Sequence, residues 1–164
     1  MAQDISLQLI AILPRLRRFA LSLAGRHDLA DDLVQISCEK ALASAASWRD
    51  GTLFDAWMFR ILRNTWIDQT RRRKTEGMTE DVYLRDDLVG VRGDQDIENK
   101  LTLQKVWGAI GALPDDQREV LVLVCVEGLT YKEAADVLDL PVGTIMSRLA
   151  RARTKIAALS GIND

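Results

Sequence analysis

Four basic side chains stand close together near the C-terminus, in a segment that has no acidic residue. They are Arg148, Arg151, Arg153 and Lys155, and the stretch 144–158 carries a charge of +4. Guanidinium and ammonium groups bind phosphate oxygens, and an arginine can also donate two hydrogen bonds to the edge of a guanine. Binding of nucleic acid is therefore the predicted chemistry, although charge patterning alone is as typical of a solvated surface helix.

The residues around this segment predict a helix-turn-helix motif at 130–156. Thr130 and Glu133 form a T-x-x-E capping box that starts a first helix. A break at 141–143 follows, and Thr144 is expected to cap the second, basic helix. The expected seam between the helices consists of Leu138, Leu140, Val142, Ile145 and Leu149. A helix presented in this way fits the major groove of duplex DNA.

A second basic segment precedes an acidic one. Residues 57–74 hold six basic side chains and one acid, for a local charge of +5, whereas residues 75–98 hold eight acids and two arginines, for −6. The net charge of −2 therefore conceals two basic segments with an acidic stretch between them. The local field, rather than the total charge, decides whether such a chain attracts nucleic acid.

Hydrophobic periodicity predicts an all-α protein of two small helical domains joined by a flexible acidic linker. Helices are expected ahead of the helix-turn-helix at about 5–24, 29–45, 53–73, 97–113 and 115–127. The periodicity disappears in the acidic stretch, which places the linker at 75–97 and the domains at 1–74 and 98–164.

Local signals predict the boundaries of the N-terminal helices. Pro14 removes a backbone donor and is expected to kink or restart the first helix. Asp28 is expected to cap the second helix, with His27 in the loop before it, and residues 50–52 should form the turn before the third.

Composition argues against several other classes of function. A hydrophobic content of 48% with 28% charged residues is typical of a soluble globular protein, and no apolar run is long enough to span a bilayer. The N-terminus lacks the basic region and cleavage site of a signal peptide, so we expect a cytoplasmic protein without membrane insertion. A single histidine and two distant cysteines predict no metal site, no cofactor and no catalytic residues.

Three segments together resemble the extracytoplasmic-function sigma factors of bacterial RNA polymerase. They are DLADDLVQISCEKAL at 28–42, FDAWMFRILRNTWIDQTRRRK at 54–74, and the segment 112–153 that contains the helix-turn-helix. They follow the family's order and cover most of the chain outside the linker. The stretch LIAILPRLRRFALSLAG at 9–25, followed by ADDLVQ, is similar to the alphaproteobacterial branch tied to the general stress response.

The resemblance implies a promoter-specificity subunit, not an enzyme, that acts on core RNA polymerase and promoter DNA. Its N-terminal domain would dock on a coiled coil of the polymerase and capture the minus-ten element as opened strand, and its C-terminal domain would bind the minus-thirty-five element as duplex. The implied docking residues are Asp31, Asp32, Leu33 and Gln35. Acids in a first helical turn also complement the helix dipole, so the segment alone does not require a partner.

The resemblance also assigns DNA-binding residues. Those implied for the minus-ten element are Trp48, Arg49, Asp50, Gly51, Arg60, Arg63, Asn64, Arg71 and Arg72. Those implied for the minus-thirty-five element are Thr144, Ser147, Arg148, Arg151 and Arg153. Trp48 could instead be a core residue beneath its loop, Asn64 a plain surface residue, and Arg148 or Arg153 members of ion pairs within the domain. The chain departs from the family pattern at Met146, where a basic residue is common, and at Ala150, where a bulkier one is frequent.

Two other classes of function remain as alternatives. A stand-alone regulator that binds duplex DNA would use the helix-turn-helix but would leave the basic segment at 57–74 and the acidic residues at 28–35 without a role. A nuclease would need a catalytic cluster that the residues do not suggest. The resemblance further implies an anti-sigma factor as a partner of the free protein.

Overall fold

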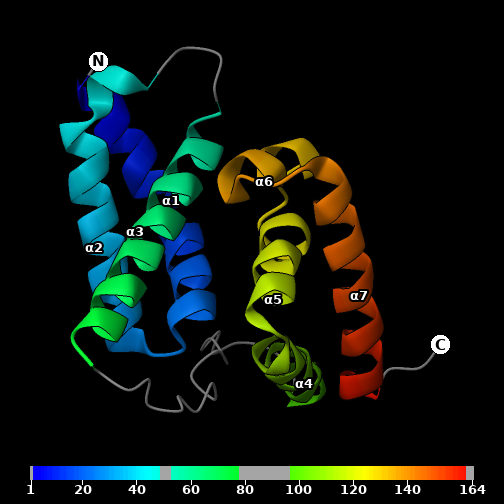
Figure 1. The fold of residues 1–164 in the computed structure, drawn as a ribbon. Helices are drawn as coiled ribbons and strands as arrows, with labels where there is room; N and C mark the ends of the chain where they lie inside the picture. Colours follow the sequence, from blue (N-terminus) through cyan, green and yellow to red (C-terminus); the bar gives the residue numbers. More distant parts are fainter. Residues whose placement is uncertain (1, 49–52, 78–96, 162–164) are drawn as a thin grey trace.

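The computed structural model describes residues 2–48, 53–77 and 97–161, and these residues form helices joined by short turns. The elements are α1 (Ala2–Ala24), α2 (His27–Ala43), the 3₁₀ turn η1 (Ala45–Ser47), α3 (Phe54–Thr75), α4 (Ile97–Ala112), α5 (Asp115–Leu121), the π-helical turn η3 (Val122–Val126), α6 (Tyr131–Leu138) and α7 (Val142–Ser160). Helices α1 to α3 form one bundle and α4 to α7 a second bundle beside it (Figure 1). The all-α prediction is confirmed. Most of the expected linker, and the turn expected at 50–52, lie outside the described residues.

The N-terminal bundle is organised by the apolar stripe of α1. Ile5, Leu9, Ile12, Leu16 and Phe19 recur at intervals of three and four and are all buried. Helix α1 runs through Pro14 without ending, so the predicted restart is wrong. Proline removes one backbone donor, and its position on the exposed side of the helix lets water satisfy the carbonyl that loses its partner.

The start of α2 differs from the prediction. The helix begins at His27, which is therefore helical and not in a loop, and Arg26 is its N-cap without a side-chain cap. Asp28 lies one residue inside the helix and is not its N-cap, and its carboxylate accepts a hydrogen bond from Arg26 Nε at 2.9 Å. This hydrogen bond lowers the pKa of Asp28 below its ordinary value.

The helix-turn-helix is formed by α6 and α7. Thr130 caps α6, since its Oγ1 accepts from the backbone N–H of Glu133 at 3.1 Å, which confirms this half of the capping box. The turn is made by Asp139, at a left-handed φ of 54°, and by Pro141, which is the N-cap of α7. The predicted cap at Thr144 is wrong, because α7 already begins at Val142.

Helix α5, which belongs to the C-terminal bundle and contacts α1, is interrupted. Helix α5 ends at Leu121 and continues as the π-helical turn η3, in which the Glu127 N–H donates to the Val122 carbonyl at 2.9 Å. Gly128 then takes a φ of 75° that suits glycine. Such a turn contains one residue more than an α-helical turn, and π-helical turns are frequent at functional positions.

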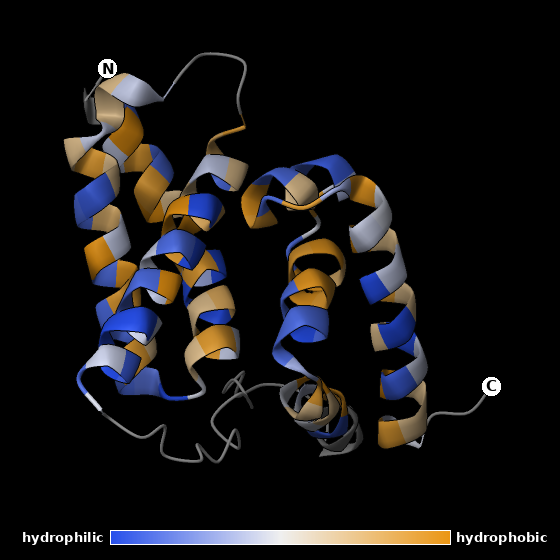
Figure 2. Cartoon of the chain, in the orientation of Figure 1, coloured by the Kyte–Doolittle hydropathy of each residue, from blue (hydrophilic) through white to orange (hydrophobic). Residues whose placement is uncertain are grey.

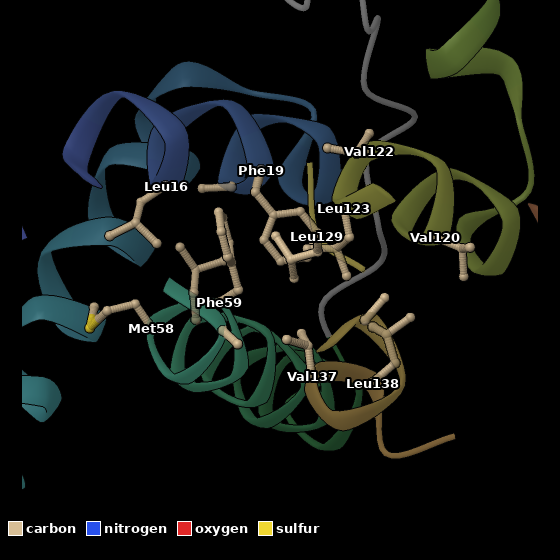
Figure 3. Packing of buried hydrophobic residues seen from close by; sticks show 14 of the residues in the cluster. Leu16, Phe19, Met58, Phe59, Val120, Val122, Leu123, Leu129, Val137 and Leu138 are labelled. Carbon is tan, nitrogen blue, oxygen red and sulfur yellow. The ribbon is translucent and has the colours of Figure 1, made fainter. Parts of the chain in front are cut away.

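The apolar core continues from one bundle into the other. Phe19 and Phe59 pack edge to face in the N-terminal bundle, with ring centroids 5.5 Å apart. Leu123 and Leu129 gather beside these rings (Figure 3) and belong to the same cluster of buried residues. The two bundles are thus packed on each other in this conformation.

In the described part of the chain, no helix has the length and apolar character needed to cross a membrane.

Candidate nucleic-acid interface

Helix α3 presents a polar face built by the basic segment at 57–74. Arg60, Asn64 and Arg71 are exposed and, at intervals of four and seven residues, lie on one side of the helix. Arg72 is also exposed. The C-terminal turns of α3 are hydrophilic in Figure 2. This face can contact phosphate oxygens along a nucleic-acid strand, and the Asn64 amide can donate to and accept from a base edge.

Trp48 is the described residue among the four at 48–51 that the resemblance assigns to the minus-ten element. Its ring packs edge to face on Phe54 at 5.4 Å and lies 6.4 Å from Trp57, and it is only partly exposed. The indole is therefore held in place by the start of α3. Arg49, Asp50 and Gly51 lie outside the described residues.

Helix α2 presents the acidic face predicted to dock on a partner. Asp31, Asp32 and Gln35 are exposed along it, and the Gln35 amide lies 3.5 Å from the Glu39 carboxylate. Leu33 is fully buried in the core of the bundle, so its assignment as a docking residue is corrected. A side chain without accessible surface stabilises the helix that carries the face but cannot itself touch a partner.

Helix α7 presents the third predicted face. Ser147 and Arg151 are exposed one helical turn apart, and Arg153 is exposed near them, while Thr144 is partly exposed. The Ser147 hydroxyl donates to the Thr144 carbonyl at 3.1 Å. Val142 is exposed, contrary to its predicted place in the seam, because it is the first residue of α7 and precedes Ile145 and Leu149, which are the buried residues of the seam.

Two of the predicted DNA-binding arginines face acids instead. Arg63 lies between the bundles, with Nε 3.3 Å from Glu119 Oε2 and Nη1 3.4 Å from the Leu138 carbonyl. Arg148 lies on the inner side of α7, with Nε 3.8 Å from Asp116 Oδ2. In this conformation both guanidinium groups face carboxylates and are only partly exposed. For Arg148 the sequence allowed either DNA binding or an ion pair within the domain, and its position near Asp116 is consistent with the ion pair.

A charge cluster around Glu127 holds the bundles together. The Glu127 carboxylate is fully buried and is bound by two arginines of α1, with Arg18 Nε at 2.8 Å and Arg15 Nε at 3.3 Å. Arg15 also pairs with Asp55 of α3 and donates to the Glu127 carbonyl at 2.6 Å. A buried carboxylate with this many donors is well compensated for its loss of water.

A second set of buried polar contacts surrounds Arg118, which is 2% exposed. Its Nε donates to the Ser22 carbonyl of α1 at 2.8 Å and its Nη1 to the Leu113 carbonyl at 2.7 Å. The neighbouring Glu119 faces Arg63 of α3, and burial raises the pKa of its carboxyl, with Arg63 opposing the shift in part. An interdomain groove of about 420 Å³ lies between α3 and α5, next to both residues.

These interdomain residues were not identified from the sequence. The available signal was the helix predicted at 115–127, which is apolar on most sides yet contains Arg118, Glu119 and Glu127. Charged side chains in a buried helix require partners. The sequence did not indicate which residues those partners would be.

Comparison with known families accounts for both bundles. The family model for sigma-70 region 2 matches residues 9–76, and the model for sigma-70 region 4 matches residues 103–156. The ECF RNA polymerase sigma factor EcfG of Rhodopseudomonas palustris is 40% identical over 92% of this chain and 82% of its own length. This chain is an extracytoplasmic-function sigma factor.

Other relatives agree with this assignment. The sigma factor SigM of Bacillus subtilis is 33% identical over 90% of each chain. Among solved structures, the sigma factor RpoE of Bartonella quintana, in complex with the anti-sigma factor NepR, has a TM-score of 0.82 at 34% identity over 99% of both chains. CnrH in complex with the cytosolic domain of CnrY has a TM-score of 0.70 at 26% identity over 100% of this chain and 92% of that one.

Membership of this family gives the protein its role. The sigma factor directs promoter-specific initiation of transcription with RNA polymerase, and it contributes binding energy rather than catalysis.

Proposed function

We propose that this sigma factor uses α3 to hold the minus-ten promoter element as opened strand and α7 to hold the minus-thirty-five element as duplex. The exposed row of Arg60, Asn64 and Arg71 supports the first assignment, since it combines phosphate-binding groups with an amide suited to base edges. The exposed pair Ser147 and Arg151 on the second helix of a helix-turn-helix supports the other.

The acidic face of α2 is the proposed docking site for core RNA polymerase. Asp31, Asp32 and Gln35 offer carboxylates and an amide to a basic partner surface, and they lie on a different helix from both DNA-binding faces. This separation is the observation that carries the proposal, because one molecule can then hold polymerase and two stretches of promoter at once. Cytoplasmic location follows from these partners.

We propose that an anti-sigma factor binds the closed arrangement, in which the two bundles pack on each other. The RpoE structure that matches over both bundles is a complex with the anti-sigma factor NepR. A TM-score of 0.82 over 99% of both chains supports a similar placement of the bundles in that complex. In this placement Arg63 is bound to Glu119. Release of the anti-sigma factor and separation of the bundles would leave the Arg63 guanidinium able to bind DNA. Similarity to EcfG supports assignment to the alphaproteobacterial general-stress-response branch.

Charge reversal on α2 tests the docking site. Asp32→Lys should weaken binding to core polymerase at least tenfold in a fluorescence anisotropy titration with labelled sigma factor. Asp4→Lys, an equal reversal at an exposed position of α1, should leave the dissociation constant within about twofold. Equal binding by the wild type and Asp32→Lys would remove α2 as the docking face.

A mobility-shift experiment separates a sigma factor that needs polymerase from a stand-alone regulator. Promoter duplex should be bound weakly by the chain alone and tightly after core polymerase is added. Tight binding without polymerase would favour the stand-alone regulator.

A further inference from the structure

Helix α7 carries an exposed apolar row beside its polar row. Val142, Met146 and Ala150 follow one another at intervals of four residues and are all exposed. Val142 is 41% exposed and Met146 is 52% exposed. Ser147 and Arg151 form the adjacent polar row, one residue further along at each turn.

The apolar row does not contribute to the packing of the domain. The buried side of α7 is already formed by Ile145, Leu149 and Ala152, which are at most 2% exposed. A single exposed apolar side chain is ordinary on a protein surface. Here, however, two large ones stand in the first two turns of α7, the end of a recognition helix that contacts base edges in helix-turn-helix proteins.

The charges around the row favour DNA as its occupant over an apolar protein surface. Residues 144–158 contain four basic side chains and no acid, and Arg151 and Arg153 are exposed near the row. Such a surface attracts a polyanion. Within the major groove, the 5-methyl group of thymine is the apolar group that base edges present. Methionine suits this contact because its unbranched side chain adapts to an irregular surface.

We propose that Met146, with Val142 beside it, contacts the 5-methyl groups of thymines in the minus-thirty-five element. The inference rests on the proposed function, in which α7 lies in the major groove of that element. Met146 would then be a specificity-determining residue that selects thymine by its methyl group. Ser147 and Arg151 would bind polar edges of the neighbouring base pairs.

Deoxyuridine provides the test, because it lacks the methyl group of thymidine and keeps the same hydrogen-bonding edge. A promoter is first selected from a duplex library with holoenzyme assembled from the full chain and core polymerase. Each thymidine of its minus-thirty-five element is then replaced singly by deoxyuridine. One or two replacements should weaken holoenzyme binding on the order of threefold to fivefold, as expected for one buried methyl group.

The variant Met146→Ala should weaken binding to the thymidine promoter by a similar factor. It should then no longer distinguish thymidine from deoxyuridine at the sensitive positions. Met146→Leu should retain the distinction, since it keeps an apolar side chain of similar volume. Leu159→Ala is the matched control, because Leu159 is 54% exposed at the other end of α7 and should leave the response to deoxyuridine unchanged.

The outcomes separate the inference from the proposed function. If scrambling the minus-thirty-five element weakens binding but no deoxyuridine does, the methyl contact is absent and the proposed function stands. If deoxyuridine weakens binding equally for wild type and Met146→Ala, another residue makes the contact and the assignment to Met146 is overturned. If scrambling the element has no effect, the proposed role of α7 fails and the inference fails with it.

Discussion

Arg18 of α1 donates two hydrogen bonds to the carboxylate of Glu127, from Nε to Oε1 at 2.8 Å and from Nη2 to Oε2 at 3.2 Å. The two residues belong to different bundles and are 109 positions apart in the chain. Because the Glu127 side chain has no exposed surface, its carboxylate relies on arginine partners in place of water, and this pair joins the two bundles. We therefore expect the closed arrangement of the sigma factor to respond to single substitutions here.

Replacing Glu127 should open the molecule. Glu127→Gln removes the negative charge and leaves Arg15 and Arg18 facing a neutral amide in a largely buried site. Breaking one partner of a buried pair costs about 3–5 kcal/mol, and since the two arginines are about one-third exposed we expect roughly 1–3 kcal/mol lower free energy of unfolding. Small-angle X-ray scattering should show a larger radius of gyration.

The control for this experiment is Asp28→Asn, which weakens the exposed pair of Arg26 and Asp28 within one bundle. It should leave both the free energy of unfolding and the radius of gyration nearly unchanged, because exposed ion pairs contribute little. An unchanged radius for Glu127→Gln as well would show that apolar packing alone closes the bundles.

The closed form should gain stability from Glu119 as the pH falls. Burial raises the pKa of this carboxyl above its ordinary value of 4.5, so the folded protein binds the proton more tightly than the unfolded chain does. The stabilisation is fully present below 4.5 and is lost as the pH rises through the raised value. Glu119→Gln removes this dependence.

Urea unfolding of both proteins between pH 4.5 and 7.5 measures the effect. The stability of Glu119→Gln relative to wild type should increase with pH across this range. Glu39→Gln, which removes an exposed carboxylate of α2, controls for the change in net charge. A relative stability that falls with rising pH would mean that the ion pair with Arg63 outweighs the cost of burial.

Arg151 and Arg153 should differ in what they contribute to promoter binding. If Arg151 binds a guanine edge, Arg151→Ala should cost roughly 1–3 kcal/mol and relax specificity at that base pair. Arg153→Ala should weaken all promoters alike and reduce the slope of log affinity against log salt by about 1. Holoenzyme titrations on single-base promoter variants at several salt concentrations distinguish the two. Equal losses on all variants for Arg151→Ala would assign it to the phosphate backbone.

The cap of α6 should stabilise the helix-turn-helix. Thr130→Ala removes the side-chain acceptor of the Glu133 N–H and should lower the free energy of unfolding by about 1 kcal/mol. Thr154→Ala is a matched control, because its hydroxyl donates to the Ala150 carbonyl within α7 and caps nothing. Thermal unfolding followed by circular dichroism compares them, and an equal effect of the two substitutions would show that the cap adds no stability.

Predicted helix caps were correct only where the helix begins directly after the predicted residue. The cap at Thr130 was confirmed. The caps predicted at Asp28 and Thr144 were wrong, because α2 and α7 begin at His27 and Val142 and leave both side chains inside the first turn. A cap requires one exact position, and the preceding turn decides which residue occupies it.

The predicted site residues also differ in whether the structure leaves them exposed. Asp31, Asp32, Asn64 and Arg151 are exposed on the helices where the sequence placed them. Leu33, in contrast, is buried. Helical periodicity determines which residues share a face, and packing of the other helices determines which face remains exposed.

The sequence by itself determined the helical class, the helix-turn-helix, the segregated charges and the membership of the sigma factor family. Each of these depends on residues close together in the chain. Only the tertiary structure decided that Arg15 and Arg18 meet Glu127 and that Arg63 meets Glu119. These partners are 56 to 112 positions apart, and no local periodicity specifies which charge of one bundle faces which charge of the other. That choice depends on how the two bundles pack on each other, through both apolar and charged contacts.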